Sequence, residues 1–318
     1  NKEIFEYGIA YMSVCVFMQI PNMVHIVIQK ILQATGNMIA PMWFQIAGVV
    51  FNFVFDPLLI FGIGPFPKMG VAGAAVATVL GYTVSTIIAL IQLFLTKQKV
   101  KPVFKNCVEP HMIKLIFSYG LPSFVMNALG AFTVNFANMF LVRYSDTAVA
   151  FFGAYFKVQQ LIFMTVNGLI QGCLPIMRFN YRAKEYSRLK QTNKSGTIIA
   201  TVMMTVGMLL VLIFPKEILF LFSASEEMCA FGVPALRIMS LGFVFSGFSA
   251  MIATYEQATD SIMPGVVIQL LRQGVLLVPV IWLLNSCIHM NGIWLAFPIT
   301  EFVTFIVAVV FSKIRSKE

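Results

Sequence analysis

The sequence is made largely of long apolar stretches separated by short polar loops. A helix needs about 20 predominantly apolar residues to cross the hydrocarbon core of a membrane. Nine stretches reach that length, and they cover approximately 8–32, 41–63, 70–96, 115–142, 147–176, 196–222, 231–254, 264–285 and 291–312. Charged residues make up 11% of the chain, whereas soluble domains carry about 25%. The sequence therefore predicts an all-α, multi-pass membrane protein with nine transmembrane helices.

Basic residues gather in the loops on one side of these predicted helices. They are concentrated in the loop near 97–114, in the segment 178–194 and in the C-terminal tail. Cytoplasmic loops of membrane proteins carry such an excess of lysine and arginine. We therefore expect a protein of the plasma (inner) membrane with a cytoplasmic C-terminus. The net charge of +9 is then loop charge, and no nucleic-acid partner is expected.

The first three predicted helices resemble the last three. Gln33–Thr35 recurs as Gln257–Thr259, and Pro57 has a counterpart in Pro279. Both copies cross the membrane in the same direction, as in transporters built from two parallel lobes. The spacing of the copies implies that three further helices precede this chain in a twelve-helix protein. We assign 1–96 to the second half of the N-lobe, 97–112 to a cytoplasmic inter-lobe loop and 113–318 to a six-helix C-lobe.

One carboxylate, Asp56, lies inside an apolar stretch. Asn52 precedes it by four residues and shares its helix face, and Pro57 follows it directly. An acid within a membrane helix costs about 2.5 to 3.5 kcal/mol on insertion scales, so it is a functional candidate. Low-dielectric surroundings disfavour its charged form, so it could take up a proton on one side and release it on the other. The alternative is an acid that reaches toward a helix end or forms a structural ion pair.

The region around Asp56 also carries a specific sequence pattern. Its two main segments read ILQATGNMIAPMW (31–43) and NFVFDPLLIFGIGPFPKMGVAGAAVATV (52–79). Shorter segments agree, among them GLPSF (120–124), RFNYRAKEYSRLKQ (178–191) and LLRQGVLLVP (270–279). The two main segments resemble the fourth to sixth helices of the multidrug and toxic compound extrusion (MATE) family, prokaryotic branch. The resemblance covers essentially the whole chain.

The resemblance implies a secondary active antiporter that exports amphipathic, often cationic drugs or toxic compounds in exchange for H⁺ or Na⁺. In similar proteins an Asn and an Asp of the fifth helix and a Thr of the sixth bind the coupling cation. These carry over to Asn52, Asp56 and Thr78, whereas a partner Asp of the first helix has no counterpart in this chain. Some relatives use a Glu of the seventh helix, but that position falls near Gly130 here.

Polar side chains within the later predicted helices are candidates for a substrate cavity. They are Lys157, Gln159, Gln160, Asn135, Asn138 and Met164. The alternatives are a snorkelling or structurally paired Lys157 and asparagines that bond neighbouring helices. Arg272 and Glu301 are expected to form structural salt bridges. Glu256, which stands where the MATE family usually has Phe, is expected to be solvated near a helix end.

Two other functions remain as alternatives to drug export. A flippase for a lipid-linked precursor would need a basic groove for pyrophosphate, and Lys157 and Arg272 are the obvious candidates for it. A truncated, non-transporting remnant is the other. The sequence has no paired carboxylates, nucleophile elbow or metal-ligand spacing, so neither an enzyme nor a cofactor beyond the coupling ion is expected. The expected partners are a small amphipathic or cationic substrate and membrane lipid, with the protein as a monomer.

Overall fold

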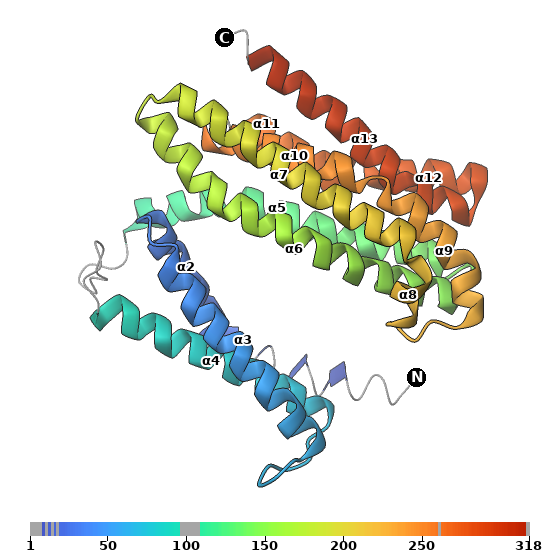
Figure 1. Cartoon of the computed structure of the whole chain (residues 1–318), viewed down its shortest axis with the longest axis horizontal. Helices are drawn as coiled ribbons and strands as arrows, with labels where there is room; N and C mark the ends of the chain where they lie inside the picture. Colours follow the sequence, from blue (N-terminus) through green and yellow to red (C-terminus); the bar gives the residue numbers. More distant parts are fainter. Residues whose placement is uncertain are drawn as a thin grey trace. The chain divides into compact units, whose positions relative to one another are not determined.

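Figure 1 shows the computed structural model of the chain, which describes residues 8–9, 12–13, 16, 19–95, 109–259 and 262–315. The chain divides into two compact units, 1–107 and 108–318. Each unit has its own buried apolar core. The predicted inter-lobe loop, 97–112, falls largely outside the described residues. The assignment of the two units to the lobes of a twelve-helix transporter stays a prediction.

The described part of the N-terminal unit is a group of three helices. They are α2 (Gln19–Ala34), α3 (Ile39–Phe61) and α4 (Val71–Leu95). α4 packs against both α3 and α2, and the core between them includes Leu32, Phe44 and Ala89. Gly62 ends α3 in the left-handed conformation, with φ of 71°, which favours glycine because it has no Cβ.

The C-terminal unit is a larger helical bundle. Its helices are α5 (Pro110–Leu141), α6 (Asp146–Arg182), α7 (Tyr186–Ile213), α8 (Pro215–Phe220), α9 (Glu226–Ser240), α10 (Phe243–Ala258), α11 (Ile262–Leu270), the π-helical turn η1 (Leu271–Val275), α12 (Leu277–Ile288) and α13 (Met290–Arg315). α10 lies against α6, α7, α11 and α13. The buried core is rich in aromatic rings, and Phe151 packs edge-on against Trp294 with ring centres 5.1 Å apart.

Seven helices within the described ranges are long and apolar enough to cross a membrane. They confirm the prediction of an all-α, multi-pass membrane protein. Of the other two predicted spans, the first is described only in part, as α2, and the fourth lies in the long helix α5, whose segment Ala128–Leu141 is a shorter apolar helix. The predicted bounds 196–222 were wrong, because α7 begins at Tyr186 and ends before Pro215, which starts α8. Proline lacks the N–H that would continue the earlier helix.

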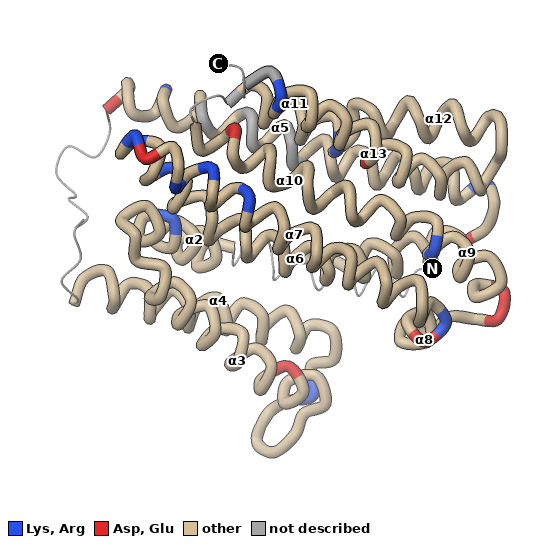
Figure 2. Tube along the Cα trace, turned by 45° about the horizontal axis from the view of Figure 1, so that its top comes forward, with Lys and Arg blue, Asp and Glu red and all other residues tan. Residues whose placement is uncertain are grey.

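The charged residues of the C-terminal unit lie mostly near helix ends (Figure 2). The basic residues Arg182, Lys184 and Arg188 surround the turn between α6 and α7. Glu226 and Glu227 lie in the first turn of α9, which follows the opposite end of α7. This separation of charge is compatible with the predicted orientation, and the cytoplasmic placement of the C-terminus stays a prediction.

Candidate coupling site and C-terminal cavity

Asp56 lies in a small polar cluster of the N-terminal unit. Asn52, one turn earlier on α3, donates from Nδ2 to Asp56 Oδ1 at 3.3 Å and to Thr78 Oγ1 of α4 at 3.4 Å. With the amide turned over, it donates to Asp56 Oδ2 at 3.2 Å and accepts from the Thr78 backbone N–H at 3.1 Å, which satisfies both of its ends. Asn52 therefore bridges the other two residues in either orientation. The structure brings the three predicted residues together, and their role in coupling stays a prediction.

Glycines on both helices allow α3 and α4 to approach closely beside this cluster. A Cβ on Gly48 would lie 2.7 Å from the Gly81 carbonyl oxygen. A Cβ on Gly81 would lie 2.8 Å from the Gly48 carbonyl oxygen and 3.1 Å from Asn52 Cβ. Ser85 Oγ of α4 also donates to the Phe44 carbonyl oxygen of α3 at 3.0 Å. Small residues bring membrane helices together in this way, and here they let Asn52 reach across to α4.

The Asp56 side chain is half-buried and lies in the last two turns of α3 rather than in its middle. The helix continues through Pro57, which removes the N–H that would bond the Phe53 carbonyl. The structure records no basic side chain within ion-pair distance of Asp56 in the ranges it describes. The alternative of a structural ion pair therefore finds no partner there.

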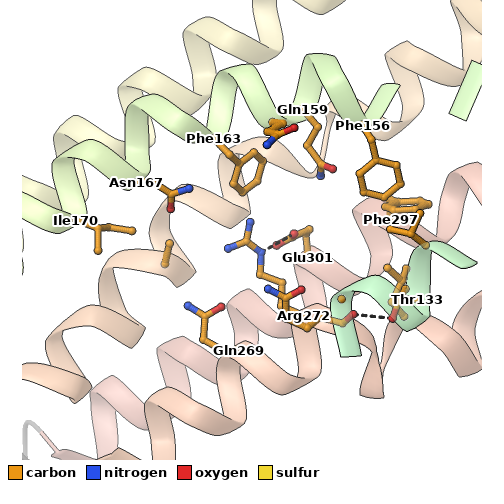
Figure 3. A pocket seen from close by; sticks show the side chains of 16 residues that line it. Thr133, Phe156, Gln159, Phe163, Asn167, Ile170, Gln269, Arg272, Phe297 and Glu301 are labelled. Atoms are coloured by element: carbon orange, nitrogen blue, oxygen red, sulfur yellow. Dashed lines mark hydrogen bonds and ion pairs between the residues drawn. The ribbon is translucent and has the colours of Figure 1, made fainter. Parts of the chain in front are cut away.

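The C-terminal unit contains a cavity of approximately 680 Å³ between α5, α6, α10, α11, η1, α12 and α13 (Figure 3). Amide side chains are prominent in its lining: Gln159, Gln160, Asn167, Gln269 and Gln273. Phe156, Phe163 and Phe297 supply its apolar surface. Gln269 and Gln273 were not among the predicted cavity residues. Their spacing of four, which places them on one helix face, was the available signal.

The predicted cavity residues do not form one site. Gln159 and Gln160 line the cavity of Figure 3, whereas Lys157 lines a separate pocket beside Asp146 and Phe222. Lys157 and Gln159 are two residues apart, so they lie on nearly opposite sides of α6.

The remaining three predicted residues, Asn135, Asn138 and Met164, are not in the lining of either pocket. Asn135 and Met164 are exposed, and Asn138 is half-buried. A substrate-binding role for these positions stays a prediction.

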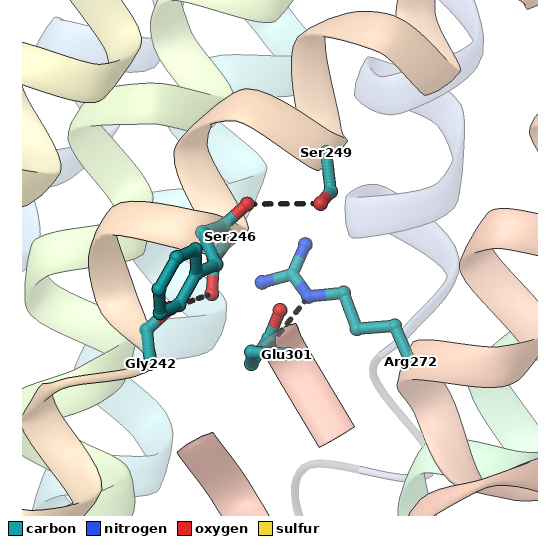
Figure 4. A network of polar contacts seen from close by, with 6 residues as sticks. Gly242, Ser246, Ser249, Arg272 and Glu301 are labelled. Carbon is teal, nitrogen blue, oxygen red and sulfur yellow. Dashed lines mark hydrogen bonds and ion pairs between the residues drawn. The ribbon is translucent and has the colours of Figure 1, made fainter. Parts of the chain in front are cut away.

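Arg272 and Glu301 form an ion pair at the wall of the cavity (Figure 4). Arg272 Nε lies 2.9 Å from Glu301 Oε1, and the two side chains are 16% and 13% exposed. The guanidinium also lies over the Phe163 ring, 4.6 Å from its centre, in a cation–π contact. The predicted salt bridge is therefore confirmed.

A π-helical turn places Arg272 and Gln273 at the cavity. Leu276 N–H donates to the Leu271 carbonyl at 3.3 Å, five residues earlier. The turn changes the regular bonding pattern, and Thr133 Oγ1 of α5 donates to the Gln273 carbonyl at 2.7 Å. Such turns interrupt helices frequently at functional sites.

Gly130 lies near the position to which the resemblance assigns a Glu in some relatives. It lines the cavity, and a Cβ there would lie 2.6 Å from Gln273 Oε1. A carboxylate at this position would therefore require Gln273 to move. In this cavity the Gln273 amide therefore fills the space beside Gly130.

Glu256 is 1% exposed, so the expectation that it is solvated was wrong. α10 continues to Ala258, and this end of the helix is covered by α11. The described ranges bring no three His, Cys, Asp or Glu side chains together in a group that could hold a metal ion.

The MatE family model matches residues 1–58 and 122–283. The chain belongs to this family. Two curated relatives are the multidrug export proteins MepA of Staphylococcus aureus (strain MSSA476) and of Staphylococcus haemolyticus (strain JCSC1435). Each is 26% identical to this MatE protein, over 269 and 268 residues respectively. The match covers 84% of this chain and 58% of each relative, so the chain spans about three fifths of their length.

Solved structures share the fold of this MatE protein. One is described as the outward-facing conformation of a multidrug resistance MATE family transporter of the MOP superfamily. It has a TM-score of 0.85 at 21% identity, over 96% of this chain and 69% of that one. Another is a MOP superfamily transporter from Pyrococcus furiosus, with a TM-score of 0.87 at 21% identity and the same coverage. At this identity the likeness establishes the fold.

Proposed function

We propose that this MatE protein exports amphipathic, often cationic compounds across the plasma membrane in exchange for H⁺ or Na⁺. The observation that carries the proposal is the cluster around Asp56. Its carboxylate has no cation partner in the described ranges and is bridged through Asn52 to Thr78. The names of the MepA relatives, which are multidrug export proteins, support the same function.

The cluster is suited to exchanging a cation. An unpaired carboxylate can bind H⁺ or Na⁺, and the Asn52 amide can either donate to the ionised acid or accept from the protonated one. Thr78 Oγ1 already donates to the Ala74 carbonyl at 2.9 Å, so its lone pairs remain available to Asn52 or to a cation. The cluster can therefore adapt its hydrogen bonds to both states of Asp56.

Pro57 connects the state of Asp56 to the shape of α3. The helix lacks one backbone hydrogen bond just before Asp56, so its last turns are easier to bend. Reversing a 1:99 population of two conformations needs about 5.5 kcal/mol of differential binding. One cation provides part of that energy, and binding of the exported compound provides the rest.

Ethidium efflux from cells that make the full-length protein tests the proposal. Asp56→Asn should abolish efflux driven by an ion gradient, because the amide cannot exchange a proton or neutralise Na⁺. Asp146→Asn is the matched control, since that acid lies at the start of α6, and it should leave efflux unchanged. Equal gradient-driven efflux by wild type and Asp56→Asn, at equal amounts in the membrane, would refute the role of Asp56.

The flippase alternative loses support from the positions of the basic residues. Arg272 is paired with Glu301, and Lys157 lines a different pocket. A pyrophosphate carries several negative charges and would need adjacent, uncompensated cations. The described part of the C-terminal unit does not place these two residues together as such a groove.

A further inference from the structure

The ion pair in the C-terminal cavity leaves much of its hydrogen-bonding capacity unused. One contact, from Arg272 Nε to Glu301 Oε1, joins the two side chains. Glu301 Oε2 is buried and has no hydrogen-bond partner among the residues that the structure describes. No protein acceptor is recorded for the terminal nitrogens of Arg272 in the described ranges, although a guanidinium offers five N–H donors.

Buried polar atoms in folded proteins are nearly always hydrogen-bonded, so an unsatisfied carboxylate oxygen calls for an explanation. Arg272 and Glu301 both line the cavity, and Figure 3 shows the guanidinium projecting into it. The unpaired oxygen of Glu301 and the unpaired N–H groups of Arg272 therefore face the same cavity. A ligand there would meet a negatively charged acceptor beside positively charged donors.

The charge balance of the cavity restricts what can enter it. Arg272 and Glu301 are the charged residues in its described lining, and their charges cancel. An added lone cation or anion would be an uncompensated charge beside two side chains that are only 16% and 13% exposed, and burying such a charge is costly. A ligand with one charge of each sign, placed beside the opposite charges of the pair, keeps the cavity neutral.

We propose that this cavity is a binding site for small zwitterionic ligands that carry an apolar ring. The ammonium group of the ligand donates to Glu301 Oε2, and its carboxylate accepts from the terminal nitrogens of Arg272. The ring lies against Phe156 and Phe297, and the amides of Gln159 and Gln273 satisfy further polar atoms. A volume of approximately 680 Å³ lies within the range of about 300–1,000 Å³ that small-molecule pockets have.

This site differs from the Asp56 cluster in what it selects. Asp56 is an acid without a basic partner in the described ranges, so it favours a cation. The C-terminal cavity favours net neutrality. Binding of a ligand in this cavity needs no ion gradient. The inference therefore goes beyond the proposed export function, and its test does not depend on that function.

Tryptophan and its capped derivatives form a matched set of probes. Tritiated tryptophan is bound to the purified full-length protein in nanodiscs without an ion gradient. The unlabelled competitors are tryptophan (zwitterion), tryptophan methyl ester (cation), N-acetyltryptophan (anion) and N-acetyltryptophanamide (neutral). Tryptophan should compete at least about tenfold better than each capped form, because each cap removes a charge-assisted hydrogen bond.

Variants connect this preference to the ion pair. The double variant Arg272→Gln/Glu301→Gln removes both charges together and avoids a buried unpaired ion. It should bind tryptophan about as weakly as the wild type binds the neutral amide. The control, Lys190→Gln/Glu185→Gln, removes one exposed cation and one exposed anion near the start of α7. It should bind the four competitors in the same order of affinity as the wild type.

Three results would overturn the proposal. They are tighter competition by the methyl ester than by tryptophan, unchanged tryptophan affinity in the double variant, and the absence of saturable tryptophan binding to a folded protein. Size-exclusion chromatography and thermal melting establish that each variant is folded, so weak binding cannot be attributed to unfolding.

Discussion

Asp56 and Glu301 are carboxylates within helices that the structure holds in opposite ways. Asp56 contacts an amide, Asn52, and has no basic partner in the described ranges. Glu301 is bonded to Arg272 at 2.9 Å, and the guanidinium is further held over Phe163. An acid inside a membrane protein can therefore be kept ready for exchange or be neutralised within the protein. The difference should separate the effects of mutations on stability from their effects on transport.

The largest expected effect on stability comes from breaking the Arg272–Glu301 pair on one side. Arg272→Met leaves Glu301 buried without its partner, which should destabilise the protein by about 3–5 kcal/mol. Thermal melting of the purified protein measures the effect. The neutral double variant Arg272→Gln/Glu301→Gln is the control and should lie much closer to wild type. If Arg272→Met is as stable as the double variant, an unpaired Glu301 carries no burial cost, which would contradict the burial of this ion pair.

Gly81→Ala should have the next largest effect. The added Cβ meets the Gly48 carbonyl and Asn52 Cβ, so α3 and α4 must separate, and overpacking of this kind costs about 1–3 kcal/mol. The melting temperature should fall, and ion-driven efflux should fall with it because Asn52 loses contact with Thr78. Gly168→Ala on α6 meets nothing within 4 Å and should leave both unchanged. Equal melting temperatures and equal efflux in the two variants would show that the close packing of α3 and α4 does not support the Asp56 cluster.

Thr133→Val tests the support of the π-helical turn. The hydroxyl that donates to the Gln273 carbonyl is lost with little change in volume, and an unsatisfied buried acceptor costs about 1–3 kcal/mol. Thermal melting should show the loss, and tryptophan competition should show a weaker zwitterion preference because Gln273 and Arg272 share the turn. Thr205→Val on α7, whose hydroxyl donates within its own helix, is the control. A larger loss in that control would contradict the role given to Thr133.

Asp56→Asn should have the smallest effect on stability, below about 1 kcal/mol. The new amide can still accept from Asn52, and no buried cation loses its partner. Ion-driven efflux should nevertheless be lost. Melting and efflux are measured on the same preparation of the full-length protein. A loss of stability as large as that of Arg272→Met would mean that Asp56 is a structural acid like Glu301.

Much of the Asp56 cluster could be predicted because it is local. Asn52 and Asp56 are four residues apart, so any helix over this stretch brings them to one face. Thr78 came from the resemblance to MATE proteins, since nothing in its own surroundings marks it. The structure adds the reason for the contact, which is the glycine-mediated approach of α3 and α4.

The C-terminal cavity was harder to predict because it depends on which helix faces meet. Lys157, Gln159 and Gln160 are close in sequence, yet only the two glutamines face the cavity. The inward face of α6 is set by its packing against α10 and the other helices of the bundle. Polarity and hydropathy do not specify that choice.

The sequence alone determined that this is a helical membrane protein, which family it resembles, and that Asn52 and Asp56 lie together. These features follow from composition, from apolar length and from contacts one helical turn apart. The tertiary structure decided that Glu301 keeps a buried, unpartnered oxygen, that a π-helical turn presents Arg272 beside it, and that both open into a cavity rich in amides. Such features join residues far apart in the chain, and their geometry is set by the packing of whole helices.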